Sequence, residues 1–121
     1  MTTHVIVIED ERPPSWNQLY SGNMHWSKRT NMAREKHLLV RANLNIEWDM
    51  FVGPVEIEVI VYFENRPQDA DNIPAKVYID GLKGWLIQDD TSKFVSRVVT
   101  ESRVDKLRPR VEIYVSSVVP L

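Results

Sequence analysis

One stretch of strict alternation constrains the fold more than any other part of this chain. Over residues 55–63, the side chain at every second position, starting with residue 55, is apolar. The positions between them begin with the charged residues Glu56 and Glu58. Because successive side chains of a strand point to opposite faces, this spacing predicts a strand with one strongly apolar face. The chain then meets Pro67, so the residues that follow are expected at the carboxyl end of a strand.

Helical signals flank this strand on both sides. Before it, Thr30 or Asn31 can cap a helix that runs to about Asn45. After it, Pro74 suits the first turn of a helix, where its missing N–H is harmless, and Gly84 is the expected end. Four apolar side chains of that second helix fall on one face and are expected in the core. These are Ala75, Ile79, Leu82 and Leu86.

Further strands complete the predicted order of elements. Residues 4–8 form a short strand, apolar on both faces, that a double proline ends, and residues 93–101 and 110–119 are expected to pair antiparallel around a charged turn. The order β-α-β-α-β-β predicts an α/β fold of the two-layer α+β kind, with two helices on a mixed sheet. At 121 residues and 43% apolar content, residues 1–121 are expected to form a single domain.

Composition excludes several kinds of site. The chain contains no cysteine, which rules out disulfides, thiolate zinc sites and cysteine nucleophiles and favours a reducing compartment. It has no secretory leader pattern and no stretch near the ~20 apolar residues of a membrane span, so we expect a cytoplasmic protein without a membrane partner. The three histidines lack metal-site spacing, and no phosphate-binding glycine loop is present.

Positive charge gathers in one segment, although the net charge is −2. Between residues 22 and 41, five basic side chains stand against the single acidic Glu35, a local balance of +4. The basic ones are Lys28, Arg29, Arg34, Lys36 and Arg41. On the predicted helix Arg34, His37 and Arg41 fall at i, i+3 and i+7, so a basic ridge would project from one side.

Two acidic clusters follow the long strand. Asp69 and Asp71 lie in DADN, and Asp89 and Asp90 lie in QDDTSK. Each cluster alone has an ordinary explanation, because Asp71 or Asn72 can cap the second helix and the later pair can form a polar turn.

Chain geometry also allows the two clusters to form one site. If residues 67–71 are extended, Asp69 and Asp71 point to the same side. The predicted helix carries the chain roughly 15 Å away and six extended residues return about 20 Å, so Asp90 can reach the same region, with Lys76 beside the three carboxylates. Oxygen ligands near an ammonium group suit a hard cation such as Mg²⁺, which can activate water against a phosphodiester.

These segments resemble a known family. RPPSWNQLY, then DADNIPAKVYIDGL, then IQDDTSKFVSRVV follow the order found in the RusA-like Holliday junction resolvases, a family frequent in phages and prophages. The resemblance covers roughly residues 13–101. It implies a small homodimeric α/β endonuclease of a bacterial or phage-infected cell, which uses Mg²⁺, or alternatively Mn²⁺, to cut four-way DNA junctions by paired nicks.

The resemblance also implies roles for individual residues. Asp69, Asp71 and Asp90 would bind the metal and, together with Lys76, would form the catalytic set. Asn72 and Asp80 match the family pattern in supporting roles. Phosphate contacts are expected from five basic residues: Lys28, Arg29, Arg34, Arg41 and Arg66.

Rival functions stay open at this level. Retention of all three aspartates favours the endonuclease, whereas the acidic net charge favours a non-catalytic module that binds branched DNA or a protein on the same fold. An enzyme of the same chemistry that cuts a different branched or flapped substrate is a further alternative.

Overall fold

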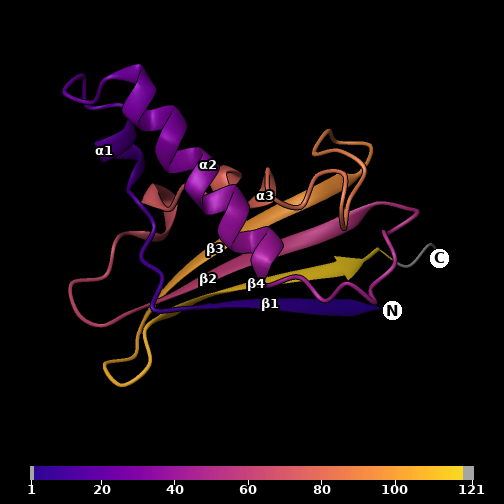
Figure 1. Cartoon of the computed structure of the whole chain (residues 1–121). Coiled ribbons are helices and arrows are strands. Elements are labelled where there is room, and N and C mark those ends of the chain that lie inside the picture. Colours follow the sequence, from indigo (N-terminus) through magenta and orange to yellow (C-terminus); the bar gives the residue numbers. More distant parts are fainter. Residues whose placement is uncertain (1, 119–121) are drawn as a thin grey trace.

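A mixed four-stranded sheet, covered on one face by helices, forms the protein (Figure 1). The computed structural model describes residues 2–118. The strands are β1 (Thr3–Glu9), β2 (Val55–Phe63), β3 (Val95–Val104) and β4 (Arg110–Ser117). The helical segments are α1 (Trp16–Leu19), α2 (Trp26–Ala42), the 3-10 turn η1 (Ala70–Asn72) and α3 (Lys76–Ile79). The predicted α+β class is confirmed, and residue 119, the end of the last predicted strand, lies outside the described residues.

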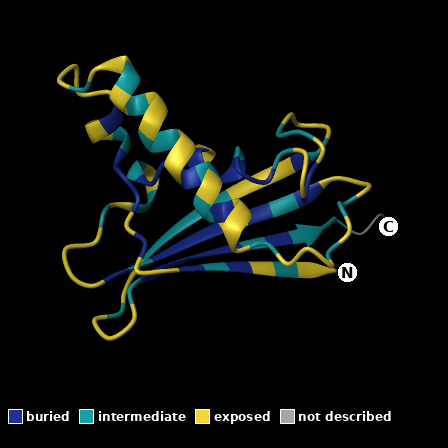
Figure 2. Cartoon of the chain, viewed as in Figure 1, coloured by how far each residue is buried: buried dark blue, intermediate teal, exposed yellow. Residues whose placement is uncertain are grey.

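Strand β2 lies inside the sheet, as its composition requires. It has the predicted bounds, and most of its side chains are buried (Figure 2). It also pairs with a neighbouring strand on each side. The strand order is β1-β4-β2-β3, with β4 antiparallel to β1 and β2, and β3 parallel to β2. In the central position, the backbone N–H and C=O groups on both edges of β2 find hydrogen-bond partners, and its apolar face is removed from water.

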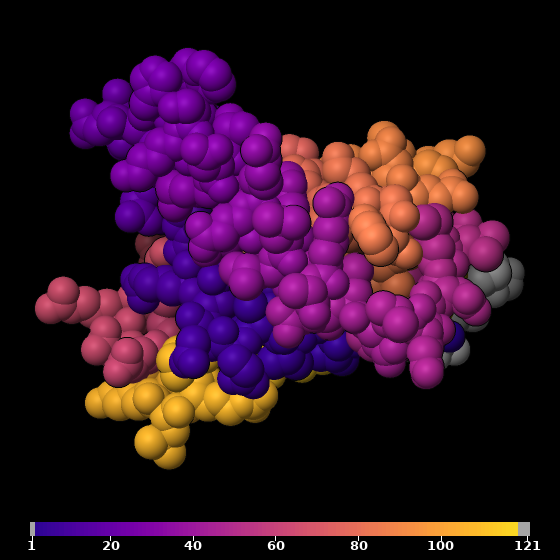
Figure 3. All heavy atoms as spheres, in the orientation of Figure 1, coloured from indigo at the N-terminus to yellow at the C-terminus, as the bar shows by residue number. Residues whose placement is uncertain are grey.

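The predicted pairing of the two C-terminal strands is wrong. β2 lies between β3 and β4, and the segment 105–109 crosses from one to the other beneath the end of β2. Adjacent strands are about 4.8 Å apart, so a loop of this length can span two such spacings. A second loop, at residues 64–68, projects from the same end of the molecule (Figure 3).

The N-cap of helix α2 lies five residues before Thr30, the first predicted cap. His25 is the N-cap residue, and its Nδ1 accepts a hydrogen bond of 3.2 Å from the backbone N–H of Ser27. Histidine is not among the common capping residues, so the sequence pattern favours Thr30 or Asn31 instead. The helix ends at Ala42, before the expected Asn45.

The predicted second helix is much shorter than expected. Only Lys76–Ile79 is α-helical, and the chain then continues through turns that include Gly84 at φ +78. At Gly81 an added Cβ would lie 2.9 Å from Cβ of Val40, so glycine here lets the turn after α3 approach α2. The predicted core residues of this segment are nevertheless all buried: Ala75, Ile79, Leu82 and Leu86.

The edge strand β1 is buried on one face only. Ile6 and Ile8 are buried, whereas Val5 is 38% exposed, so only one of the two apolar faces of this strand is covered. No helix within residues 2–118 is long and apolar enough to cross a membrane.

A buried polar triad joins the loop after β1 to both covering helices. Nζ of Lys36 on α2 lies 2.8 Å from Oε2 of Glu11, and the hydroxyl of Tyr78 on α3 donates to the same oxygen at 2.9 Å. The Lys36 and Glu11 side chains are only 9% and 8% exposed. Burial and the neighbouring Glu11 carboxylate raise the pKa of Tyr78 well above its ordinary value, so its hydroxyl remains a donor.

Candidate active site

The segment that carries the first acidic cluster is anchored beside the sheet at three points. The hydroxyl of Thr100 on β3 donates to the carbonyl of Ala70 at 2.7 Å. The side-chain amide of Gln68 donates to the carbonyl of Pro13 at 3.0 Å. The backbone N–H of Asn17 donates to Oδ1 of Asn72 at 3.2 Å.

Asp69 and Asp71 open into one small polar recess. Its walls also include Trp16, Asn17 and Asn72. The backbone turns through η1 here and is not extended as predicted, yet both carboxylates still face the same recess. Both are exposed, and within residues 2–118 neither forms an ion pair with a basic side chain. Their negative charge is therefore not neutralised by the protein.

Asp90 belongs to a second cluster, formed with two lysines and Asp80. Nζ of Lys76 and Nζ of Lys83 each lie 3.5 Å from Oδ2 of Asp90. The same ammonium groups lie 3.3 and 3.2 Å from Oδ1 of Asp80, respectively. The other oxygen of Asp80 is 3.8 Å from Nε2 of His37. Asp80 and Asp90 thus share the same two lysines as ion-pair partners.

Charge balance determines the ionisation of this cluster. Burial would raise the pKa of Asp90, but the ammonium groups of Lys83 and Lys76 outweigh burial and hold this pKa below its ordinary value. A hydrogen bond to Asp80 raises the pKa of Lys83. The lowered pKa of Asp90 and the raised pKa of Lys83 both favour the charged forms that make this ion pair.

The structure joins some of the predicted site residues and separates others. Lys76 contacts Asp90 as expected, but it does not stand beside Asp69 and Asp71 as part of a single three-carboxylate cluster. Among the described residues no three histidine, cysteine, aspartate or glutamate side chains are grouped to hold one metal ion. The role of Lys83 was missed, although its position three residues after Asp80 places both on one helical face.

The donor chemistry of the recess fits a hard divalent cation in part. Carboxylate and amide oxygens of Asp69, Asp71 and Asn72 are the ligand types that Mg²⁺ prefers, and the two exposed charges have no protein partner. Asp90 would have to exchange its contacts with Lys76 and Lys83 before it could join them.

The basic residues expected to contact DNA occupy different environments. Lys28, Arg34 and Arg41 are exposed on α2, and Arg66 is exposed in the loop after β2. Arg29 is half-buried and donates from Nε to the carbonyl of Leu19 at 2.8 Å.

Two features of this basic segment differ from its sequence pattern. Lys36 is paired with Glu11 inside the protein, so one of the five counted charges is not available at the surface. Arg34 and His37 line one cavity, whereas Arg41 lies over the ring of Trp85, 5.7 Å from its centroid. The predicted ridge is therefore split between two places.

Comparison with known proteins identifies a family for this chain. The model of the family described as "Endodeoxyribonuclease RusA" matches residues 11–116, nearly the whole chain. No curated protein shows a significant match to the chain. The family match includes both acidic clusters, α2, β2, β3 and all of β4 except Ser117, whereas β1 lies before the matched range. The chain therefore belongs to the RusA endodeoxyribonuclease family.

Proposed function

We propose that this protein is a Mg²⁺-dependent endonuclease that resolves four-way DNA junctions by paired phosphodiester cleavage. Membership of the family supports endodeoxyribonuclease activity and implies junction resolution. The observation that carries the metal-dependent part is the pair of exposed, uncompensated carboxylates of Asp69 and Asp71 at the carboxyl end of β2. Such a pair is unfavourable without a cation and suits one well.

The proposed roles follow from what each side chain can contact. Asp69 and Asp71 would hold the ion, and Asp90 would complete the ligand set after release from its lysines. A bound Mg²⁺ supplies polarisation of the phosphate and a water of lowered pKa. Lys76, freed from Asp90 by the same exchange, would place its ammonium group where negative charge develops on the phosphate. Asp80 would keep Lys83 and Lys76 nearby.

Substrate binding is proposed to use the exposed basic residues of α2 together with Arg66. Lys28, Arg34 and Arg41 offer phosphate contacts, which supply affinity without reading sequence. Two symmetric nicks need two active sites, and the described chain carries one candidate site, so a homodimer is part of the proposal.

A junction cleavage assay tests this function directly. The protein is incubated with an end-labelled four-way junction or a linear duplex of the same sequence, in Mg²⁺, Mn²⁺ or EDTA. We expect symmetric nicks in the junction alone, and their loss in EDTA and in Asp71→Asn. Asp49→Asn is the matched control, because it makes the same chemical change on an exposed residue outside both acidic clusters.

The alternative is a binding module that does not cut. The acidic net charge of −2 favours it. Tight junction binding by the wild-type protein, with no product in either Mg²⁺ or Mn²⁺, would replace the endonuclease proposal with this one.

A further inference from the structure

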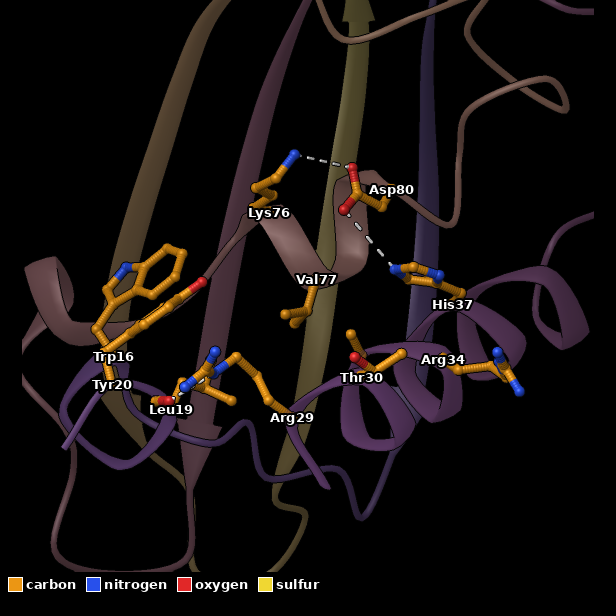
Figure 4. A pocket seen from close by; sticks show the side chains of 11 residues that line it. Trp16, Leu19, Tyr20, Arg29, Thr30, Arg34, His37, Lys76, Val77 and Asp80 are labelled. Carbon is orange, nitrogen blue, oxygen red and sulfur yellow. Dashed lines mark hydrogen bonds and ion pairs between the residues drawn. The ribbon is translucent and has the colours of Figure 1, made fainter. Parts of the chain in front are cut away.

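A cavity of about 430 Å³ lies between α1, α2 and α3 (Figure 4). Its volume falls within the range of roughly 300–1,000 Å³ typical of small-molecule sites. Trp16 lines both this cavity and the recess of Asp69 and Asp71, so the two spaces are neighbours that share one indole ring. Lys76 also lines the cavity. A ligand in it would therefore lie directly beside the candidate active site.

One wall of the cavity is aromatic. The rings of Trp16 and Tyr20 lie with centroids 5.7 Å apart and planes 30° apart, and Tyr20 is 63% exposed. Buried Leu19 and Val77 add apolar surface between the helices. Flat rings at the mouth of an apolar recess offer a stacking surface for another flat ring.

The remaining walls are basic. Arg29 lies over Tyr20, with its guanidinium carbon 4.6 Å from the ring centroid, and Arg34 follows five residues later on α2. Within residues 2–118 Arg34 forms no ion pair and no side-chain hydrogen bond. The one carboxylate of the cavity, Asp80, is already paired with lysine. The cavity therefore combines a stacking surface with cations that can receive a phosphate.

His37 adds a polar group suited to an uncharged partner. Its Nε2 is buried and has no hydrogen-bond partner among the described residues, and the nearest carboxylate oxygen, on Asp80, is 3.8 Å away. Burial lowers the pKa of His37, so the imidazole is neutral at pH 7. A neutral imidazole can donate to, or accept from, the edge of a base.

We propose that this cavity binds one unpaired nucleotide of the DNA substrate, with its base against Trp16 and Tyr20 and its phosphate on Arg29 and Arg34. The inference rests on the proposed action on DNA and adds to it a reason for preferring branched substrates. A paired base is stacked on both sides and its hydrogen-bonding edge is occupied, so it would have to leave the helix to enter. At the branch point of a four-way junction, where strands exchange partners, nucleotides can be unstacked. A linear duplex does not supply such nucleotides.

The test measures binding in EDTA, so that cleavage plays no part. The probes are a short single strand with a central 2-aminopurine and a hairpin duplex in which the same base is paired. We expect the wild-type protein to bind the single strand more tightly and to change its emission. Tyr20→Ala should weaken this binding by roughly five- to a hundredfold. Trp26→Ala should leave it unchanged, because Trp26 is similarly exposed, at 67%, but does not line the cavity.

A second variant blocks the space without removing a stacking ring or a charge. Ala33→Leu adds volume from α2, and we expect the same loss of single-strand binding. Equal affinity of the wild type for both probes, or unchanged binding in Tyr20→Ala and Ala33→Leu, would overturn the inference even if junctions are cut. Conversely, retained single-strand binding with no junction cleavage in Mg²⁺ would sink the proposed function and leave this cavity assignment intact.

Discussion

Replacing Lys36 by methionine should destabilise the protein more than any exposed substitution. The variant removes the ammonium group that lies 2.8 Å from Glu11 and leaves a carboxylate inside the protein with only the Tyr78 hydroxyl as partner. Removing one partner of a buried ion pair costs about 3–5 kcal/mol. A domain of this size has a free energy of unfolding of about 5–15 kcal/mol, so the loss is a large fraction of the total.

Urea unfolding followed by tryptophan fluorescence measures this loss. For a urea dependence of roughly 2 kcal/mol per M, we expect the unfolding midpoint of Lys36→Met to fall by about 2 M. The double variant Glu11→Gln/Lys36→Met should recover much of the stability, because it removes the buried charge as well. The reasoning fails if the single variant loses less than about 1 kcal/mol, the value for a solvated pair, or if the double variant is no more stable than the single one.

Three further outcomes are expected. Since burial lowers the pKa of His37, the unfolded chain binds a proton at this imidazole more readily than the folded protein, and the free energy of unfolding should fall as pH drops below about 6.5. Urea unfolding at several pH values should show a smaller fall in His37→Asn. An equal fall in the variant would contradict the lowered pKa of His37. Arg34→Ala should weaken junction binding at all sequences and reduce the salt dependence of log K by about 1, whereas Lys106→Ala, in the turn before β4, should not change that slope in titrations at several salt concentrations. Gly81→Ala should lower the melting temperature and reduce the free energy of unfolding by about 1–3 kcal/mol, because the new Cβ would lie 2.9 Å from Cβ of Val40. An unchanged melting curve would mean that the turn after α3 is not held this closely against α2.

Local periodicity was enough to predict the burial of particular side chains. The bounds of β2 follow from its alternation, and Ala75, Ile79, Leu82 and Leu86 are buried as their spacing indicates. Burial tracks the repeat of apolar residues whether the backbone is one long helix or a short helix followed by turns. The helix length itself was predicted wrongly, because the close approach of Gly81 to α2 is a contact between distant segments.

Strand pairing is a different case. Strands β3 and β4 are adjacent in sequence, and this adjacency favoured a hairpin. The strand between them is β2, whose side chains are mostly buried and whose backbone groups find partners on both edges. Which strand fills the centre depends on the burial available in the whole sheet, and no local pattern contains that information.

The candidate site divides in the same way. By itself the sequence determined the family, and through the resemblance it predicts which side chains act: Asp69, Asp71, Asp90 and Lys76. Only the tertiary structure decided their charge partners, since it pairs Asp90 with two lysines and leaves Asp69 and Asp71 without a cation. The physical reason is that the energy of an ion pair depends on the distance between its two charges in space and weakens as that distance grows. This distance bears no fixed relation to their separation along the chain.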